Sequence, residues 1–144
     1  MINCRAYGDP KGQPRIRRSR HGGVYTPTTA DGWRTMVALA IRQQNLTSPM
    51  DGPVRMAVEF VFKRPKHHSN KSGIKTTAPM WHTSRPDIDN LIKLIMDVCT
   101  EMEVYTDDTQ VVRLETVKRY ANDEKPGASI RINSVKASPI LPAG

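Results

Sequence analysis

The stretch from Val54 to Phe62 constrains the fold of this 144-residue chain more than any other. Every second side chain in it is apolar, and the positions between include charged ones. The two sets are Val54, Met56, Val58, Phe60 and Phe62 against Arg55, Ala57, Glu59 and Val61. Side chains of a β-strand alternate between two faces, so a period of two predicts a strand with one buried face.

Two segments show the period of an α-helix, with apolar side chains three and four positions apart. Asp31 is a candidate N-cap for the first, which ends near Asn45. Its apolar face consists of Trp33, Val37, Ala40 and Ile41. The second begins at about Asp87 or Asp89 and ends at Glu103. Its apolar stripe consists of Leu91, Leu94, Ile95, Val98 and Met102.

The remaining patterns complete a fold class. Further strands are expected over residues 2–7, 110–119 and 129–135. Residues 122–127 are expected to form the hairpin loop between the last two strands. Strands mixed with two helices predict an α+β fold, with a small mixed β-sheet and two main helices packed on it. We expect a single, dimer-forming domain over residues 1–135 and a flexible C-terminal tail, rich in Pro, Ala and Ser, over residues 136–144.

The charge balance indicates a polyanionic partner. The chain has 22 Lys and Arg against 14 Asp and Glu, a net charge of +8. Such a charge attracts nucleic acid or an anionic membrane. No apolar run approaches the roughly 20 residues that a membrane-spanning helix needs, and the first residues lack the apolar stretch of a signal peptide. We therefore expect a cytoplasmic nucleic-acid-binding protein, with no membrane partner; the alternative is that the charge serves solubility alone.

Two long polar segments, residues 8–30 and 63–85, supply many of the cations. Both are expected to be loops, and loops of this length are usually functional or disordered. The side chains that we expect to contact nucleic acid are Lys11, Arg15, Arg17, Arg18, Lys63, Arg64, Lys66 and Arg85. For each one taken singly, a solvated surface charge is the simpler alternative.

Metal binding through Cys or His is not indicated. Cys4 and Cys99 have no cysteine partner at zinc-binding spacing. The histidines do not have the spacing of zinc ligands either. His67 and His68 lie in the second polar segment, where we expect solvated loop residues; the alternative is that they contact DNA.

The scarcer acidic residues gather in two short clusters. One is Asp87 and Asp89 in Arg-Pro-Asp-Ile-Asp-Asn-Leu-Ile-Lys (85–93), and the other is the pair at 107 and 108. On the helix, Asp89 and Lys93 share a face turned away from the core. If the strand that follows packs alongside this helix, we expect Asp107 and Asp108 to return to the helix start. The carboxylates would then form an open Mg²⁺ or Mn²⁺ site.

Each cluster also has a simpler explanation. An Asp at a helix N-terminus is a common cap and interacts favourably with the helix dipole. Asp89 and Lys93 have the spacing of a surface ion pair, and Asp107-Asp108 could be a plain turn. Together the clusters favour a metal site, because grouping the scarce charge costs repulsion that a bound cation removes.

The segment 85–93 and the segment Thr-Asp-Asp-Thr-Gln-Val-Val (106–112) together resemble the RusA-type Holliday-junction resolvases of bacteria and their phages. The similarity extends from residue 2 to about residue 135. The resemblance implies a homodimeric, Mg²⁺-dependent endonuclease that resolves four-way junctions by paired symmetric nicks in DNA recombination and repair. Its partner would be branched DNA, it would need no small-molecule cofactor, and Mn²⁺ should substitute for Mg²⁺.

The resemblance also assigns residues. Asp87, Asp89, Asp108 and Lys93 match the catalytic positions of the family. The three aspartates would be metal ligands, and Asp107 matches a less critical acidic neighbour. Two other functions stay open at this point: another Mg²⁺-dependent nuclease, acting on flaps or forks, and a non-catalytic basic DNA-binding module.

Overall fold

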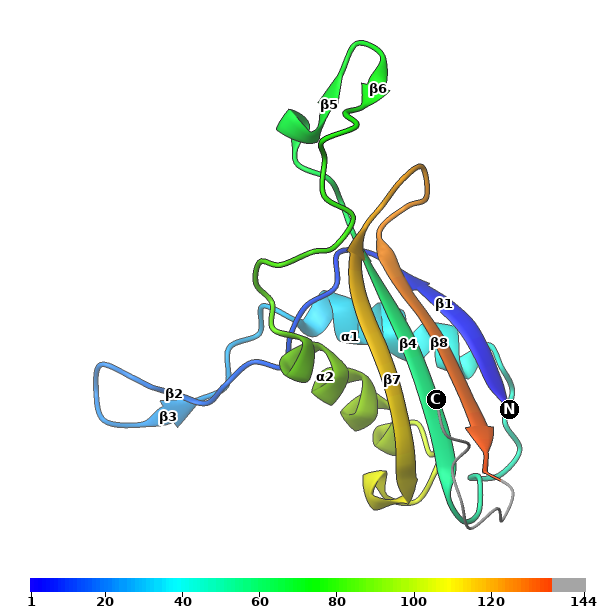
Figure 1. The fold of residues 1–144 in the computed structure, drawn as a ribbon. Coiled ribbons are helices and arrows are strands. Elements are labelled where there is room, and N and C mark those ends of the chain that lie inside the picture. The colour runs from blue at the N-terminus through cyan, green and yellow to red at the C-terminus, as the bar shows by residue number, and fades with distance from the viewer. Residues whose placement is uncertain (136–144) are drawn as a thin grey trace.

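A four-stranded sheet forms the body of the protein, whose structure is a computed structural model that describes residues 1–135. The strands are, in spatial order, β1 (Ile2–Tyr7), β8 (Gly127–Ser134), β4 (Val54–Phe62) and β7 (Val111–Tyr120) (Figure 1). β8 runs antiparallel to both of its neighbours, whereas β4 and β7 are parallel. The sheet is therefore mixed. The tail expected over residues 136–144 lies outside the described residues.

Two helices cover one face of this sheet, α1 (Asp31–Arg42) and α2 (Ile88–Glu101) (Figure 1). α1 begins after Ala30, so Asp31 lies in its first turn and not at the N-cap. Both helices lie within the segments that their apolar stripes predict, and both end before the expected residue. The predicted α+β fold, with a mixed sheet and two helices, is confirmed.

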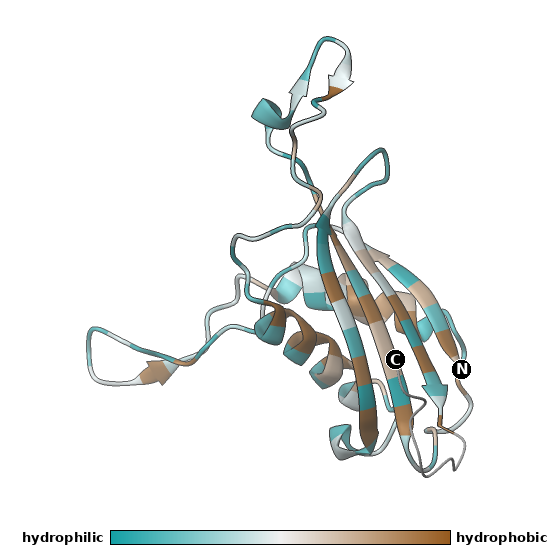
Figure 2. Cartoon of the chain, viewed as in Figure 1, coloured by the Kyte–Doolittle hydropathy of each residue, from teal (hydrophilic) through white to brown (hydrophobic). Residues whose placement is uncertain are grey.

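The core lies between the sheet and the helices. Met56 and Phe60 of β4 are fully buried there, together with Leu91 and Leu94 of α2 and Val37 of α1. Burying one such side chain completely stabilises the fold by about 1.5–3 kcal/mol. The alternating strand and the helical stripe therefore meet in one cluster. Figure 2 shows the same alternation of hydrophobic and hydrophilic residues along the strands.

β7 and β8 do not form the expected hairpin, because β4 lies between them. The connection over residues 121–126 passes the end of β4 instead. β4 takes an interior position because it is apolar on both faces towards its end, where Val61 is as fully buried as its neighbour Phe60. β7 stays at the edge, where Val112 and Leu114 remain 61% and 44% exposed.

The first of the two basic segments is an arm that extends from the body (Figure 1). This first arm, residues 8–30, contains an antiparallel ribbon of β2 (Arg17–Arg18) and β3 (Val24–Tyr25). Ser19 closes the ribbon, since its amide donates to the Gly23 carbonyl. The sequence prediction of an unbroken loop is therefore wrong for these few residues, which are too short to show a period.

The second arm, residues 63–85, extends in another direction (Figure 1). It contains a 3₁₀ turn at Lys66–His68 and a ribbon of β5 (Ser69–Asn70) and β6 (Gly73–Ile74). As in the first arm, local pairing orders a segment that we expected to be a loop.

Aromatic side chains fasten the base of the second arm to the sheet. His82 stacks on Phe62 with ring centroids 3.8 Å apart. His68 meets the Tyr120 ring edge-on at 4.8 Å and is only 6% exposed. The expectation that His68 is solvated is wrong, because the 3₁₀ turn folds it back onto β7.

No helix within residues 1–135 is both long enough and apolar enough to cross a membrane.

Candidate active site

The N-terminus of α2 presents two carboxylates. Asp87 occupies the N-cap position with extended backbone angles (φ −68°, ψ 146°), and its side chain makes no capping hydrogen bond. Its carbonyl accepts the first helical hydrogen bond, from Leu91. Asp89 lies exposed in the first turn, and Lys93 is exposed one turn further along. The Asp87 carboxylate is therefore free of the capping role that the simpler explanation would give it.

Asp87 faces a hollow of about 750 Å³ between the bases of the two arms. The cations that line it are Lys11, Arg15, Arg17, Lys63 and Arg85. These residues come from both basic segments, and the fold brings them to the same end of α2. The hollow thus combines a carboxylate with several cations, the charge pattern that a phosphodiester backbone and a metal ion together require.

The other three expected DNA contacts lie elsewhere. Arg18 is exposed on β2, and Lys66 is exposed in the 3₁₀ turn of the second arm. Arg64 is engaged within the chain: it donates to the carbonyls of Ala121 and Pro79, each at 2.7 Å. Its guanidinium therefore fastens the second arm to the body.

The base of the first arm rests on the first turn of α2. The amide of Gln13 donates to the Asn90 carbonyl at 2.9 Å, and Arg34 of α1 donates to the Gln13 side chain at 3.0 Å. Gly12 packs so closely that a Cβ there would lie 3.0 Å from the Asn90 Cβ. No pattern in the sequence indicates this contact, which joins a loop to a helix far along the chain.

This base also separates two hollows. One is the hollow that contains Asp87, and the other, of about 650 Å³, contains Asp89 and Lys93. Gln13 and Arg15 line both. The first arm therefore leads directly to the residues predicted to be catalytic.

Asp107 and Asp108 lie at the opposite end of α2. They share a hollow with Asp97, Thr100 and Glu101 from the last turns of the helix. A helix of 14 residues is about 21 Å long, whereas two ligands of one Mg²⁺ ion lie within about 4 Å of each other. The expectation that Asp107 and Asp108 return to the start of the helix is wrong for a single chain, because β7 begins where α2 ends. Within residues 1–135, no three His, Cys, Asp or Glu side chains are grouped to hold a metal ion.

Asp107 and Asp108 have different surroundings. Asp107 caps the 3₁₀ turn η2 (Asp108–Gln110), since its carboxylate accepts from the Thr109 amide at 2.9 Å. This hydrogen bond lowers the pKa of Asp107. The hydrogen bond with Asp107, followed by burial and the charges of Asp107 and Asp97, raises the pKa of Asp108. Asp107 is thus occupied in the turn, and Asp108 is the better candidate for a ligand.

Sequence reasoning missed Lys118, a residue of β7. It lines a hollow of about 470 Å³ with Asp87 and Arg85. The sequence offers no signal for it, because the pairing of Lys118 with Phe60, which directs the lysine to the face that carries the helices, is seen only in the sheet register. A lysine at such a position is unusual enough to indicate a specific role.

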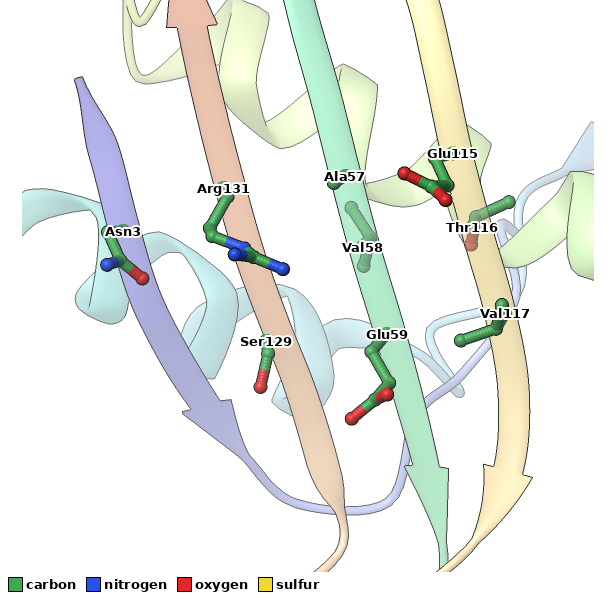
Figure 3. A pocket seen from close by; sticks show the side chains of 9 residues that line it. All are labelled: Asn3, Ala57, Val58, Glu59, Glu115, Thr116, Val117, Ser129 and Arg131. Carbon is green, nitrogen blue, oxygen red and sulfur yellow. The ribbon is translucent and has the colours of Figure 1, made fainter. Parts of the chain in front are cut away.

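A further hollow, of about 520 Å³, lies on the uncovered face of the sheet (Figure 3). Glu59, Glu115 and Arg131 line it, with the helices behind the strands. No residue predicted to be catalytic borders it. The site at α2 is therefore the better candidate.

Comparisons with known proteins agree with the motifs. The family model for endodeoxyribonuclease RusA matches residues 8–133, so the chain belongs to this family of nucleases. It is 34% identical over 142 residues to YqaN of Bacillus subtilis, covering 94% of this chain and 98% of that protein. It is also 49% identical over 55 residues to the crossover junction endodeoxyribonuclease rusA of Lactococcus phage r1t, covering 38% of this chain and 40% of that protein.

Proposed function

We propose that this protein is a divalent-metal-dependent endodeoxyribonuclease that resolves four-way DNA junctions by paired symmetric nicks. The observation that carries the proposal is the hollow at the start of α2, where Asp87 lies among five cations from two arms. The family supports a nuclease, and the name of the phage relative supports crossover junctions as the substrate.

The basic residues of the two hollows would have different roles. Lys11, Arg17, Lys63 and Arg85 hold the DNA backbone by its phosphates, independently of sequence. Lys93, one helical turn from Asp89, offsets the negative charge that builds on the phosphate oxygens during cleavage. Attack by water at phosphorus with departure of the 3′ oxygen leaves 5′-phosphate and 3′-hydroxyl ends, which a ligase can join.

One chain does not bring a full set of metal ligands together, but two chains do if their α2 helices lie antiparallel across a two-fold axis. The start of each helix then lies beside the end of its partner. Asp87 and Asp89 of one protomer and Asp108 of the other would hold a Mg²⁺ ion. When bound, this ion would supply Lewis acidity and lower the pKa of a bound water.

The exposed edge of β7 supports this assembly. Val112 and Leu114 are large apolar side chains, 61% and 44% exposed, on the strand that follows Asp108 directly. No strand covers the outer edge of β7 from Val111 to Val117 within the described part of the chain. An isologous contact here would bury both the apolar side chains and the open strand edge.

Such a dimer has two composite sites, one at each end of the helix pair. They lie roughly the length of α2 apart, about 21 Å. Each faces one of two opposing DNA strands, which is the arrangement that paired symmetric nicks require.

The test is complementation between two inactive variants. One carries Asp87→Asn and Asp89→Asn, and the other carries Asp108→Asn. A mixed dimer would contain one complete site and one site lacking all three carboxylates. We therefore expect each variant alone to leave a labelled four-way junction intact, and the co-refolded mixture to nick one strand per junction.

A mixture as inactive as its components would rule out the shared site. The same assay on flap, fork and linear duplex DNA tests the substrate. Equal nicking of flaps and junctions would contradict junction resolution while leaving the nuclease in place. Nicking that is unchanged in both variants would instead make the protein a non-catalytic DNA-binding module contaminated by another nuclease.

A further inference from the structure

We propose that Lys118 is a positioning residue of the active site, which holds in place the chain segment that carries Asp87. The inference rests on the proposed nuclease function and adds a residue that the sequence motifs do not contain. Lys118 comes from β7, at the sheet edge, whereas Asp87, Asp89 and Lys93 all belong to α2 or its cap.

Three successive contacts attach the segment before Asp87 to β7. The Tyr120 amide donates to the Met80 carbonyl at 2.9 Å, and the His82 amide donates to the Lys118 carbonyl at 3.2 Å. The Lys118 ammonium then donates to the Ser84 carbonyl at 2.7 Å. This third contact is the last of the series, and only two residues separate Ser84 from Asp87.

The surroundings of Lys118 indicate why a lysine is present there. Its side chain is partly buried, and this burial lowers the pKa of Lys118, while the charge of Asp87 acts in the opposite direction. Removing a charged group from water is unfavourable unless it is paired or hydrogen-bonded. Lys118 meets this condition through its hydrogen bond to the Ser84 carbonyl, and the nearby charge of Asp87 also favours the charged lysine.

Lys118 and Lys93 approach the carboxylates from different sides. Lys93 lies in the hollow that contains Asp89, whereas Lys118 shares a hollow with Asp87 and Arg85. Holding Ser84 fixes where the chain enters α2, and the entry point fixes the Asp87 carboxylate. A displacement of such a group by about 1 Å can slow a reaction by about a hundredfold.

The test compares Lys118→Met with Lys118→Arg and with Lys125→Met. Methionine keeps the length of the side chain but removes its charge and donors, and arginine keeps both. Lys125 is an exposed lysine in the connection between β7 and β8, so its variant controls for the loss of one positive charge. The readouts are single-turnover nicking at saturating protein, junction affinity without Mg²⁺, and hydrogen exchange of residues 83–88.

We expect Lys118→Met to slow nicking about a hundredfold, with junction affinity changed less than about threefold. Hydrogen exchange of residues 83–88 should become faster in the same variant. Lys118→Arg should restore slow exchange and most of the nicking rate, and Lys125→Met should behave as the unaltered protein.

Two results would overturn the inference. The first is hydrogen exchange in Lys118→Met equal to that in Lys125→Met, since the contact with Ser84 would then not restrain residues 83–88. The second is unaltered nicking despite faster exchange, since Lys118 would then stabilise the fold without affecting the reaction. If the unaltered protein nicks no junction, the proposed function fails, and the exchange result alone decides whether Lys118 holds the segment.

Discussion

Individual carboxylates at the two ends of α2 differ in how much of their hydrogen-bonding capacity is already used. Asp107 accepts from the Thr109 amide and so belongs to the turn before β7. Asp89 accepts from the neighbouring Asn90 amide at 2.9 Å, a local contact that leaves its second oxygen available. Asp87 makes no capping bond. These differences rank the acids for metal binding in a way that their positions in the sequence do not.

Replacing Asp87 by Asn should abolish nicking while keeping junction binding. The change removes a negative charge beside the cations of the hollow, so affinity without Mg²⁺ should stay the same or rise. Gel-shift and nicking assays on the same labelled junction measure both quantities. Asp107→Asn is the matched control, because the amide oxygen can still accept from Thr109; loss of nicking there too would assign Asp107 to the site.

The first arm is joined to α2 at Gly12, and this contact allows a prediction at the scale of the element. Gly12→Ala places a Cβ 3.0 Å from the Asn90 Cβ, so the first turn of α2 or the arm must shift by a few tenths of an ångström. Because such a shift moves Asp89 relative to its neighbours, nicking should slow by about tenfold. Single-turnover rates measure this.

Gly23→Ala is the control for that variant. It lies in the same arm, but its added Cβ would meet only the Ser19 hydroxyl, at 3.6 Å. We expect its nicking rate to be unchanged. Equal rates for both variants would show that the contact between Gly12 and α2 does not position the site.

The second arm should loosen in acid, because its base depends on neutral histidines. Burial, and then the charges of His67, Arg64 and Lys75, lower the pKa of His68 from 6.5. Burial and the charge of Lys118 likewise lower the pKa of His82. The unfolded chain therefore binds more protons than the folded one in the window just below pH 6.5, and stability falls as pH decreases through that window.

We expect the midpoint temperature of thermal unfolding to decrease when the pH is lowered from about 7.5 to about 5.5. The decrease should be smaller in His68→Phe. Phenylalanine keeps an aromatic ring against Tyr120 but cannot titrate. Circular dichroism melts at the two pH values provide the measurement. An identical decrease in both proteins would assign the pH dependence to other groups.

At the scale of the whole molecule, the fold separates a side rich in cations from one of mixed charge. The arms and the start of α2 bring cations from distant segments to one hollow, and a dimer would present that hollow twice. The uncovered sheet face instead mixes Glu59 and Glu115 with Arg131 (Figure 3). Junction affinity should therefore depend on the arms and hardly at all on this face.

The salt dependence of binding tests that separation. With about 6–10 phosphate contacts, affinity should fall about 10³- to 10⁵-fold between about 50 and 200 mM salt. Arg17→Ala should reduce the slope, whereas Arg131→Ala, on the opposite face, should leave it unchanged. A flat salt response of the unaltered protein would contradict binding through the DNA backbone.

The sequence by itself determined the four strands of the sheet and the two helices, and it supplied the candidate reactive residues. The period of two in β4 and the stripe of α2 report which face of each element is buried, and this information is local along the chain. The spacing of Asp87, Asp89 and Lys93 follows from the same helix. The motifs at 85–93 and 106–112 pointed to the nuclease family that the comparison over residues 8–133 supports.

Only the tertiary structure decided which of these residues meet. It placed β4 between β7 and β8, put Asp108 a helix length from Asp87, buried His68 and brought Lys118 beside Asp87. Strand order and direction set these distances, and they result from long-range packing of apolar faces that no single segment encodes. A periodic pattern fixes the face on which a side chain lies, but it carries no information about the neighbour that packs against that face.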